Sequence, residues 1–156
     1  MEKSNHRIKL KESQVALIEK LAGLHRELAP AVAKVWALLF VSDEVELTFD
    51  QIKDTLNLSK GATSQAINYL LLMKKIEAVA HLQDRKRYFR VRVASWKTDI
   101  GEIFEGLQLQ VDIYREILKQ RPAKTAAFNK DMDEMVRFMN FIRGELITAF
   151  KKYTKE

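Results

Sequence analysis

Apolar residues recur with the period of α-helices over the first half of the chain. A first helix is expected to begin with Ser13 as its N-cap. Pro30 fits the first turn of a second helix, where its missing N–H breaks no hydrogen bond. Thr48 and Gln51 have the spacing of a capping box, which predicts a third helix over residues 49–56.

A connection of three residues separates the third helix from a fourth. Asn57 tolerates the left-handed conformation that ends a helix, and Ser59 can cap the next one. Leu58 between them is apolar and can fill the gap between the helices. Two short helices joined in this way are typical of a helix-turn-helix. The residues expected on the inner face of the fourth helix are Ala66, Ile67, Leu70 and Met73.

Beyond residue 73 the hydrophobic period changes from helical to alternating. Residues 77–82 and 87–93 form two strand-like runs around the polar residues 83–86. One face of the second run is apolar and the other is basic, as expected of a half-buried hairpin. The two sets are Phe89, Val91 and Val93 against Tyr88, Arg90 and Arg92. A helix-turn-helix followed by a basic hairpin predicts a winged helix.

The last 60 residues return to a helical period, with steps of three and four. One apolar series consists of Ile100, Phe104, Leu107, Val111, Tyr114 and Leu118. After Arg121-Pro122, a second consists of Phe128, Met132, Met135, Met139, Ile142, Leu146 and Ala149. This spacing predicts an antiparallel helical pair with coiled-coil-like seams.

The second predicted helix of this pair is too apolar to be covered by the first alone. Phe138, Phe141, Phe150 and Tyr153 widen its apolar surface beyond one seam. We therefore expect the hairpin to pack on the first helix and on a second copy of the chain, as a dimerisation element. The residues predicted for dimerisation are Ile100, Phe104, Leu107, Val111, Met132, Met135, Met139, Ile142 and Leu146.

The predicted fold is mainly α with a small β-hairpin. Residues 1–96 are expected to form a winged helix-turn-helix DNA-binding domain with an N-terminal helix, and residues 97–156 a helical dimerisation region. A length of 156 residues with 47% hydrophobic content is enough for a compact core without a metal or disulfides. The absence of cysteine excludes a disulfide scaffold, a zinc ribbon and a cysteine nucleophile.

The location of the charge is more informative than its sum. The net charge is +6, and residues 60–92 account for all of it, with eight basic and two acidic residues. The other 123 residues hold 19 of each sign. A basic run can be an ordinary solvated face, but here it coincides with the predicted helix-turn-helix and hairpin. The chain has neither an apolar window of 18 residues nor a secretory signal, so a cytoplasmic protein without membrane association is expected.

The fourth predicted helix carries the residues suited to reading double-stranded DNA. Gln65 and Asn68 can each pair with adenine in the major groove, and Lys60 suits guanine or phosphate. Gly61 leaves no bulk at the helix start. A face selected only for solubility is the alternative, but no acid occurs over residues 60–75. The predicted contacts are Ser59, Lys60, Gly61, Ser64, Gln65 and Asn68.

The predicted hairpin supplies the second set of DNA contacts. Arginine suits the narrow minor groove, whereas strand arginines are expected to meet phosphates. Asp84 either pairs with Arg85 or Arg87 or is a turn residue. The predicted wing contacts are Asp84, Arg85, Lys86, Arg87, Arg90 and Arg92. Two recognition helices of a homodimer would enter successive major grooves, about 34 Å apart, on a near-palindromic site.

The chain resembles MarR-type winged-helix transcriptional regulators, specifically the GbsR-like branch. The resemblance covers about 60 residues, from the apolar segment 31–40 through Leu58-Ser59-Lys60-Gly61 to Asp84-Arg85-Lys86-Arg87-Tyr88. It implies a homodimer, a repressor-like role and dimer contacts from the terminal helices. It also assigns Ser59, Lys60, Ser64 and Gln65 to the recognition helix and Asp84, Arg85 and Arg87 to the wing.

The sequence departs from the pattern of this family at three positions. Lys53 and Thr63 stand where a small and an aliphatic residue are common, and Lys74 replaces the glycine that usually ends the recognition helix. The family also implies a ligand, because GbsR-like relatives are thought to sense small quaternary amines. An aromatic cage is one possibility and ordinary core packing the other; the residues concerned are Trp36, Trp96, Phe104 and Tyr114.

Other functions have less support in the sequence. No phosphate-binding glycine loop, HExxH or G-x-S-x-G motif occurs, so no enzyme and no cofactor are expected. His81 near Asp84 has no further ligands at useful spacing, so no metal site is expected. We predict a repressor acting by promoter occlusion, because no activation module is visible. The alternative is a winged helix that binds a protein; RNA binding is disfavoured because no stacking platform for single strands is present.

Overall fold

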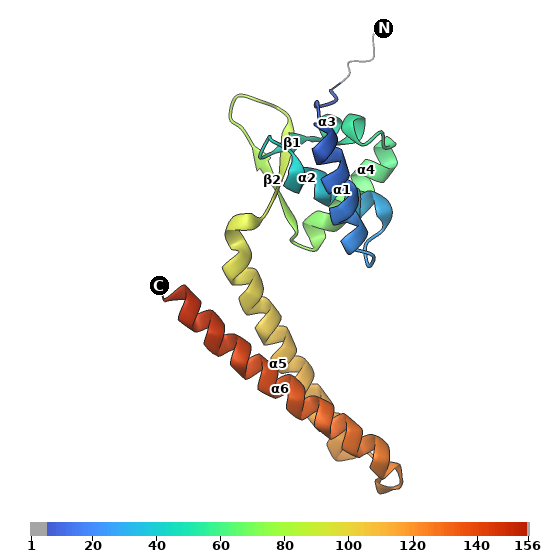
Figure 1. Ribbon diagram of the computed structural model, residues 1–156, viewed down its shortest axis with the longest axis vertical. Coiled ribbons are helices and arrows are strands. Elements are labelled where there is room, and N and C mark those ends of the chain that lie inside the picture. Colours follow the sequence, from blue (N-terminus) through green and yellow to red (C-terminus); the bar gives the residue numbers. More distant parts are fainter. Residues whose placement is uncertain (1–5, 156) are drawn as a thin grey trace. The chain divides into compact units, whose positions relative to one another are not determined.

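The computed structural model describes residues 6–155 and consists of two compact units, Met1–Val93 and Ala94–Glu156 (Figure 1). The division expected after residue 96 lies three residues beyond this boundary. The elements of the first unit are α1 (Glu12–Leu24), α2 (Pro30–Val41), β1 (Leu47–Thr48), α3 (Phe49–Thr55), α4 (Lys60–Leu72), β2 (Ile76–Ala80) and β3 (Arg87–Val91). The second unit contains α5 (Trp96–Gln120) and α6 (Ala126–Thr154). The predicted fold class is confirmed.

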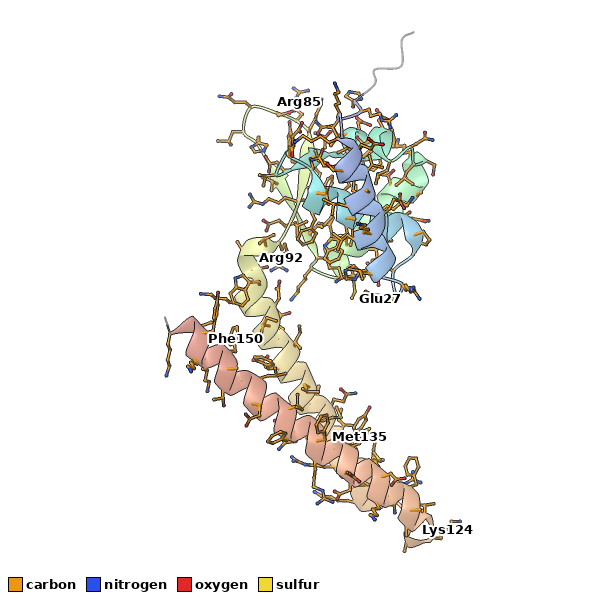
Figure 2. All side chains as sticks on the ribbon, in the orientation of Figure 1. Glu27, Arg85, Arg92, Lys124, Met135 and Phe150 are labelled. Carbon is orange, nitrogen blue, oxygen red and sulfur yellow. The ribbon has the colours of Figure 1, made fainter. Side chains whose placement is uncertain are left out.

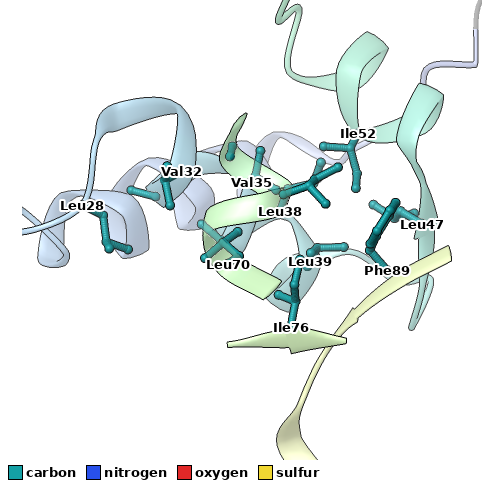
Figure 3. Packing of buried hydrophobic residues seen from close by; sticks show 14 of the residues in the cluster. Leu28, Val32, Val35, Leu38, Leu39, Leu47, Ile52, Leu70, Ile76 and Phe89 are labelled. Atoms are coloured by element: carbon teal, nitrogen blue, oxygen red, sulfur yellow. The ribbon is translucent and has the colours of Figure 1, made fainter. Parts of the chain in front are cut away.

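The core of the first unit is built around α2. Val35, Ala37 and Leu38 have no exposed surface, because this helix packs against α1, α4 and β3. Figure 3 shows residues from the surrounding elements converging on it, among them Ile52 of α3 and Leu70 of α4. A helix that is apolar on nearly every side is stable only when it is enclosed in this way.

The capping signals of the helix-turn-helix are confirmed. The Thr48 hydroxyl accepts from the Gln51 N–H at 3.2 Å, and the Thr48 N–H donates to the Gln51 side chain at 2.8 Å. Asn57 has a φ of 51°, in the left-handed region. The Ser59 hydroxyl then accepts from the Ala62 N–H at 3.1 Å and starts α4. The predicted turn is therefore formed by local hydrogen bonds.

The C-terminal end of α4 differs from the prediction at Met73, which is 51% exposed instead of facing inward. The helix ends at Leu72, and Lys74 has a φ of 53°. The Lys74 N–H donates to the Leu71 carbonyl and the Lys75 N–H to the Leu70 carbonyl, as in a Schellman motif. This turn carries Met73 away from the core.

Thr63 supplies part of the inner face of α4 in the position where an aliphatic residue was expected. It is completely buried, together with Ala66, Ile67 and Leu70. Its hydroxyl donates to the Ser59 carbonyl at 2.9 Å. Because this bond satisfies the buried hydroxyl, threonine can stand in the core here.

The wing is part of a three-stranded antiparallel sheet with the order β1-β3-β2. The sequence predicted only two of these strands, because β1 has two residues and no detectable period. Leu47 and Thr48 of β1 pair with Phe89 and Tyr88 of β3. The strands are also shorter than predicted: β3 ends at Val91, and Val93 is 61% exposed, so the predicted apolar face loses its last member.

The start of α1 is also corrected. Lys11, not Ser13, is the N-cap, because the Lys11 N–H donates to the Gln14 side chain at 2.8 Å. Gln14 is 7% exposed, and its amide nitrogen donates to the Val41 carbonyl at 3.1 Å and to Asp43 at 2.9 Å. These contacts with the end of α2 select the helix start, and they cannot be seen in the local sequence.

In the second unit, α5 and α6 form the predicted antiparallel hairpin. The series expected on α5 is its inner face, with Val111 completely buried. On α6 the inner face is rotated from the prediction. Val136 is 1% exposed, whereas four members of the expected seam face outward. These are Phe128, Met135, Leu146 and Ala149.

A polar network at the hairpin turn explains this rotation. Asn129 accepts from the Arg121 guanidinium at 2.7 Å and from the Thr125 hydroxyl at 2.9 Å, and donates to the Pro122 carbonyl at 3.2 Å. Farther along, Arg143 donates to the Phe104 carbonyl at 3.2 Å. Because polar residues occupy the inner face of α6, apolar periodicity alone selects the wrong row.

The left-handed residue at the end of α4 leads to a test of stability. Lys74→Gly should raise the free energy of unfolding by about 1 kcal/mol, since glycine adopts this backbone conformation without a steric cost. Met73→Gly, next to it at a φ of −77°, is the matched control and should lower the free energy of unfolding. Urea unfolding of the full chain measures both. A loss of stability in Lys74→Gly would show that the lysine side chain contributes more than the backbone conformation costs.

Candidate nucleic-acid interface

The outer face of α4 presents polar residues to solvent. Ser64, Gln65 and Asn68 are exposed, while the residues between them are buried. Within residues 6–155 no hydrogen bond involves the side chains of these three residues. Lys60 and Gly61 precede them at the exposed start of the helix. The structure therefore brings these five predicted residues onto one accessible surface, with Ser59 engaged as the N-cap beside them.

Gly61 has no structural reason to be a glycine. Its φ is not positive, and a Cβ added to it would meet no atom within 4 Å. Glycine also lowers helix stability relative to alanine. The other four glycines of the chain likewise have open space at the Cβ position, so packing does not require glycine at position 61.

The wing loop is braced by Asp84. Its carboxylate accepts from the Tyr88 hydroxyl at 2.7 Å and from the Lys86 N–H at 3.0 Å. The first of these bonds is the main reason why the pKa of Asp84 lies below its usual range, and it raises the pKa of Tyr88. Of the two roles left open for Asp84, the contacts support the turn residue over a partner for the wing arginines.

The cations of the wing fall into two groups. Arg85 and Lys86 extend from the exposed loop, and Figure 2 shows Arg85 at its tip. In contrast, the Arg90 guanidinium lies 2.7 Å from the Glu77 carboxylate across the β2–β3 pair, and Arg92 donates to the Lys74 carbonyl at 3.2 Å. A phosphate contact by Arg90 would have to compete with Glu77.

His81 forms a hydrogen bond with Glu46 through its Nε2, and its ring packs edge-on against Tyr88 with 4.8 Å between the ring centroids. These contacts hold the end of β2 against the segment before β1. No group of three metal-ligating side chains occurs within residues 6–155.

The four aromatic residues considered for a ligand cage are divided between the two units. In the first, Trp36 packs edge-on against His25 and Phe40, and the Lys75 ammonium lies 4.7 Å from its ring centre. In the second unit, the rings of Trp96 and Phe104 both pack against the ring of Phe150, with centroid distances of 6.0 and 5.7 Å. Tyr114 accepts a hydrogen bond from Gln110 at 2.9 Å.

One basic segment was not identified from the sequence. The His6 N–H donates to Asp54 at 3.0 Å and the Ile8 N–H to the Thr55 hydroxyl at 3.1 Å, so an extended segment docks on α3. Its side chains alternate between partly buried and exposed. The exposed ones belong to Arg7, Lys9 and Lys11. This alternation of apolar and basic residues was the available signal, but it spans too few residues to distinguish from a coil.

Comparison with solved structures finds proteins that are similar to this chain to different degrees. A crystal structure described as a transcriptional regulator covers 92% of this chain and 99% of its own, with a TM-score of 0.73 and 19% identity. The adhesin competence repressor AdcR from Streptococcus pyogenes covers 92% of this chain and 95% of its own, with a TM-score of 0.40 and 18% identity. A mutant of MarR from E. coli, complexed with operator DNA, covers 80% of this chain and 86% of its own, with a TM-score of 0.39 and 17% identity.

The first of these similarities shows that the chain has the fold of that regulator over nearly its whole length. At 19% identity this similarity shows the fold alone. No family model and no curated protein sequence matches the chain. Within the described residues, no helix is long and apolar enough to span a bilayer.

The brace in the wing leads to a test by titration. Removal of the hydroxyl in Tyr88→Phe should raise the pKa of Asp84 toward the usual carboxyl range, measured from its side-chain carbon shift by NMR. The ionised Asp84 carboxylate orders the wing at pH values above the usual carboxyl pKa. This stabilisation is lost as the pH falls through the lowered pKa of Asp84. Because the Lys86 N–H donates to Asp84, its amide hydrogen should exchange with solvent faster in Tyr88→Phe than in the wild type. Tyr69→Phe on α4 is the control, and equal Asp84 pKa values in all three proteins would contradict the assignment.

Proposed function

We propose that this protein is a sequence-specific double-stranded DNA-binding transcriptional regulator of the MarR type. The single observation that carries the proposal is the outer face of α4, where exposed amide and hydroxyl groups occur without an acid over residues 60–75. An α-helix with such a face fits the major groove, where bases are read by hydrogen bonds. The related fold of a transcriptional regulator supports the same function.

The two parts of the surface have different roles in this proposal. Gln65 and Asn68 read base edges in the major groove, while Arg85 and Lys86 approach the backbone or minor groove from the wing. Asp84 acts by positioning the wing through Tyr88 and does not contact DNA itself. Arg90 keeps its proposed phosphate role only by sharing its guanidinium between Glu77 and the DNA.

A homodimer provides the geometry for a near-palindromic site. Large apolar side chains remain exposed on both helices of the second unit, which is unfavourable for a monomer in water. They include Ile103 and Leu109 on α5 and Phe138, Phe141 and Tyr153 on α6, all at least 60% exposed. Met135 and Leu146, which were expected to contribute to dimerisation, are also exposed. A second copy of the chain would bury this surface, and repression would follow from occlusion of the promoter.

The contacts of the aromatic residues favour a packing role over a cage for quaternary amines. The face of Trp36 is already occupied by the Lys75 ammonium, and Phe150 fills the space beside Trp96 and Phe104. Release of DNA by choline or betaine remains the test of the GbsR-like assignment.

Selection of bound sequences from a random duplex pool tests the proposed function. Enrichment of a near-palindromic sequence is expected, and the affinity for random duplex should fall steeply with salt because phosphate contacts release counterions. Gln65→Ala should cost about 1–3 kcal/mol on the selected site and relax its base preference at one position. Gln120→Ala, an exposed glutamine on α5, is the control. No enrichment together with a flat salt dependence would favour the alternative of a winged helix that binds a protein.

Gly61 supplies an independent test, because folding and binding should respond in opposite directions. Gly61→Ala should raise the free energy of unfolding by about 0.5–1 kcal/mol, through the helix propensity of alanine. The same change should weaken DNA binding, because the added methyl group stands where the helix start approaches the duplex. Urea unfolding and titration with the selected duplex measure the two effects. Unchanged DNA affinity would mean that the helix start does not approach the duplex closely.

A further inference from the structure

The helix α3 carries no cation that is without an acidic partner. In a helix-turn-helix bound to DNA, the first helix crosses the sugar–phosphate backbone, and here that helix is α3. Within Phe49–Thr55 the only basic residue is Lys53. Its ammonium lies 3.0 Å from the Asp50 carboxylate and 3.3 Å from the Asp54 carboxylate. Two carboxylates beside one ammonium leave α3 with a net negative charge, which is unfavourable beside a polyanion.

The segment before α1 places basic side chains next to this helix. Ile8 and Leu10 pack against the hydrophobic core, and the side chains that alternate with them are exposed. The exposed residues are Arg7, Lys9 and Lys11, so the cations lie on one side of the segment. Alternate side chains of an extended chain are about 6.6–6.8 Å apart, so these cations form a regular row. The spacing is comparable with that of successive phosphates along a DNA strand.

Hydrogen bonds fix the segment to α3 at two points. The His6 N–H donates to the Asp54 carboxylate at 3.0 Å, and the Ile8 N–H donates to the Thr55 hydroxyl at 3.1 Å. Asp54 and Thr55 are the last two residues of α3, shortly before α4 begins at Lys60. The row of cations is therefore attached to the part of the helix-turn-helix from which the recognition helix starts. Figure 1 shows this segment in dark blue next to α3.

The two lysines of the row are accessible to a ligand. Within residues 6–155 the Lys9 side chain has no hydrogen bond and no ion pair. The Lys11 ammonium lies 3.4 Å from the Asp43 carboxylate, but these side chains are 71% and 72% exposed. Because an ion pair this exposed contributes little to stability, a phosphate can replace Asp43 at small cost.

We propose that the exposed side of this segment binds the DNA backbone beside the groove that α4 enters, with Lys9 and Lys11 each contacting a phosphate. These contacts supply the positive charge that α3 lacks, and they carry no sequence information. Attachment to Asp54 and Thr55 positions the lysines, and Arg7 extends the same row. The inference rests on the proposed function, because it concerns the same complex with DNA.

Neutral variants titrated with random duplex test the phosphate contacts. Lys9→Gln and Lys11→Gln should each weaken binding about three- to tenfold near 0.1 M salt. Each should also reduce the slope of log affinity against log salt by about one per protomer, because fewer counterions are released. Lys20→Gln on α1 and Lys124→Gln between α5 and α6 remove the same charge from exposed positions elsewhere and are the controls. Equal losses in variants and controls would reflect net charge alone and would overturn the proposal.

A second variant keeps every cation and loosens the attachment of the segment. Thr55→Val removes the hydroxyl that accepts from the Ile8 N–H, and valine has nearly the shape of threonine. The affinity for the selected duplex and the salt slope should both fall, while urea unfolding verifies that the variant is folded. Thr148→Val, which removes a hydroxyl from α6, is the control. Wild-type affinity and slope in Thr55→Val would overturn the role of the attachment in positioning the lysines.

Ethylation interference on the selected duplex locates the contacts. In the double variant of Lys9→Gln and Lys11→Gln, interference should disappear at phosphates beside the groove that α4 enters, and the base preference should remain that of the wild type. An altered base preference would overturn the assignment to phosphates. If the wild type binds no duplex, the proposed function fails and this inference fails with it. If it binds with a steep salt dependence that the lysine variants leave unchanged, only this inference fails.

Discussion

The burial of α2 over most of its surface is the constraint on which the first unit depends. Because Val35, Ala37 and Leu38 have no exposed surface, α1, α4 and the sheet must each present an apolar face to this helix. For α4, that requirement commits Thr63, Ala66, Ile67 and Leu70 to the interior. The opposite face is then free of packing demands, and its composition can be selected for contacts outside the chain. The proposed DNA-reading surface is the consequence of this division.

The structure also reduces the number of cations that are available to a polyanion. The sequence concentrates its whole net charge of +6 in residues 60–92, but Arg90 is committed to Glu77 and Arg92 to the end of α4. The exposed basic residues of this segment are Lys60 at the start of α4, Lys74 at its end, and Arg85, Lys86 and Arg87 in the wing, where Asp84 and Tyr88 order the loop. The N-terminal segment adds a second group of basic side chains beside α3. The distribution of basic side chains on the surface therefore differs from their distribution along the sequence.

In the second unit, polar contacts decide which apolar residues remain exposed. Asn129 is held by Arg121, Thr125 and Pro122 at the turn, and Arg143 bonds to the backbone of α5. Both polar residues lie on the inner face of α6, which leaves Met135, Phe138 and Leu146 exposed. In a monomer the exposure of these apolar side chains to water is unfavourable. The same exposed row gives the proposed dimer its apolar surface.

Local signals in the sequence determined the helix-turn-helix, because its turns are made by hydrogen bonds between near neighbours. The capping box at Thr48, the left-handed Asn57 and the cap at Ser59 need no distant partner, and the seam of α5 follows directly from its period. Only the tertiary structure decided the start of α1, the strand β1, the inner face of α6 and the docking of the N-terminal segment on α3. Each depends on contacts between residues far apart in the chain, such as Gln14 with Val41, Leu47 with Phe89 and Ile8 with Thr55. Hydrophobic periodicity describes one element at a time, so it cannot report which polar group on a second element will pair with it.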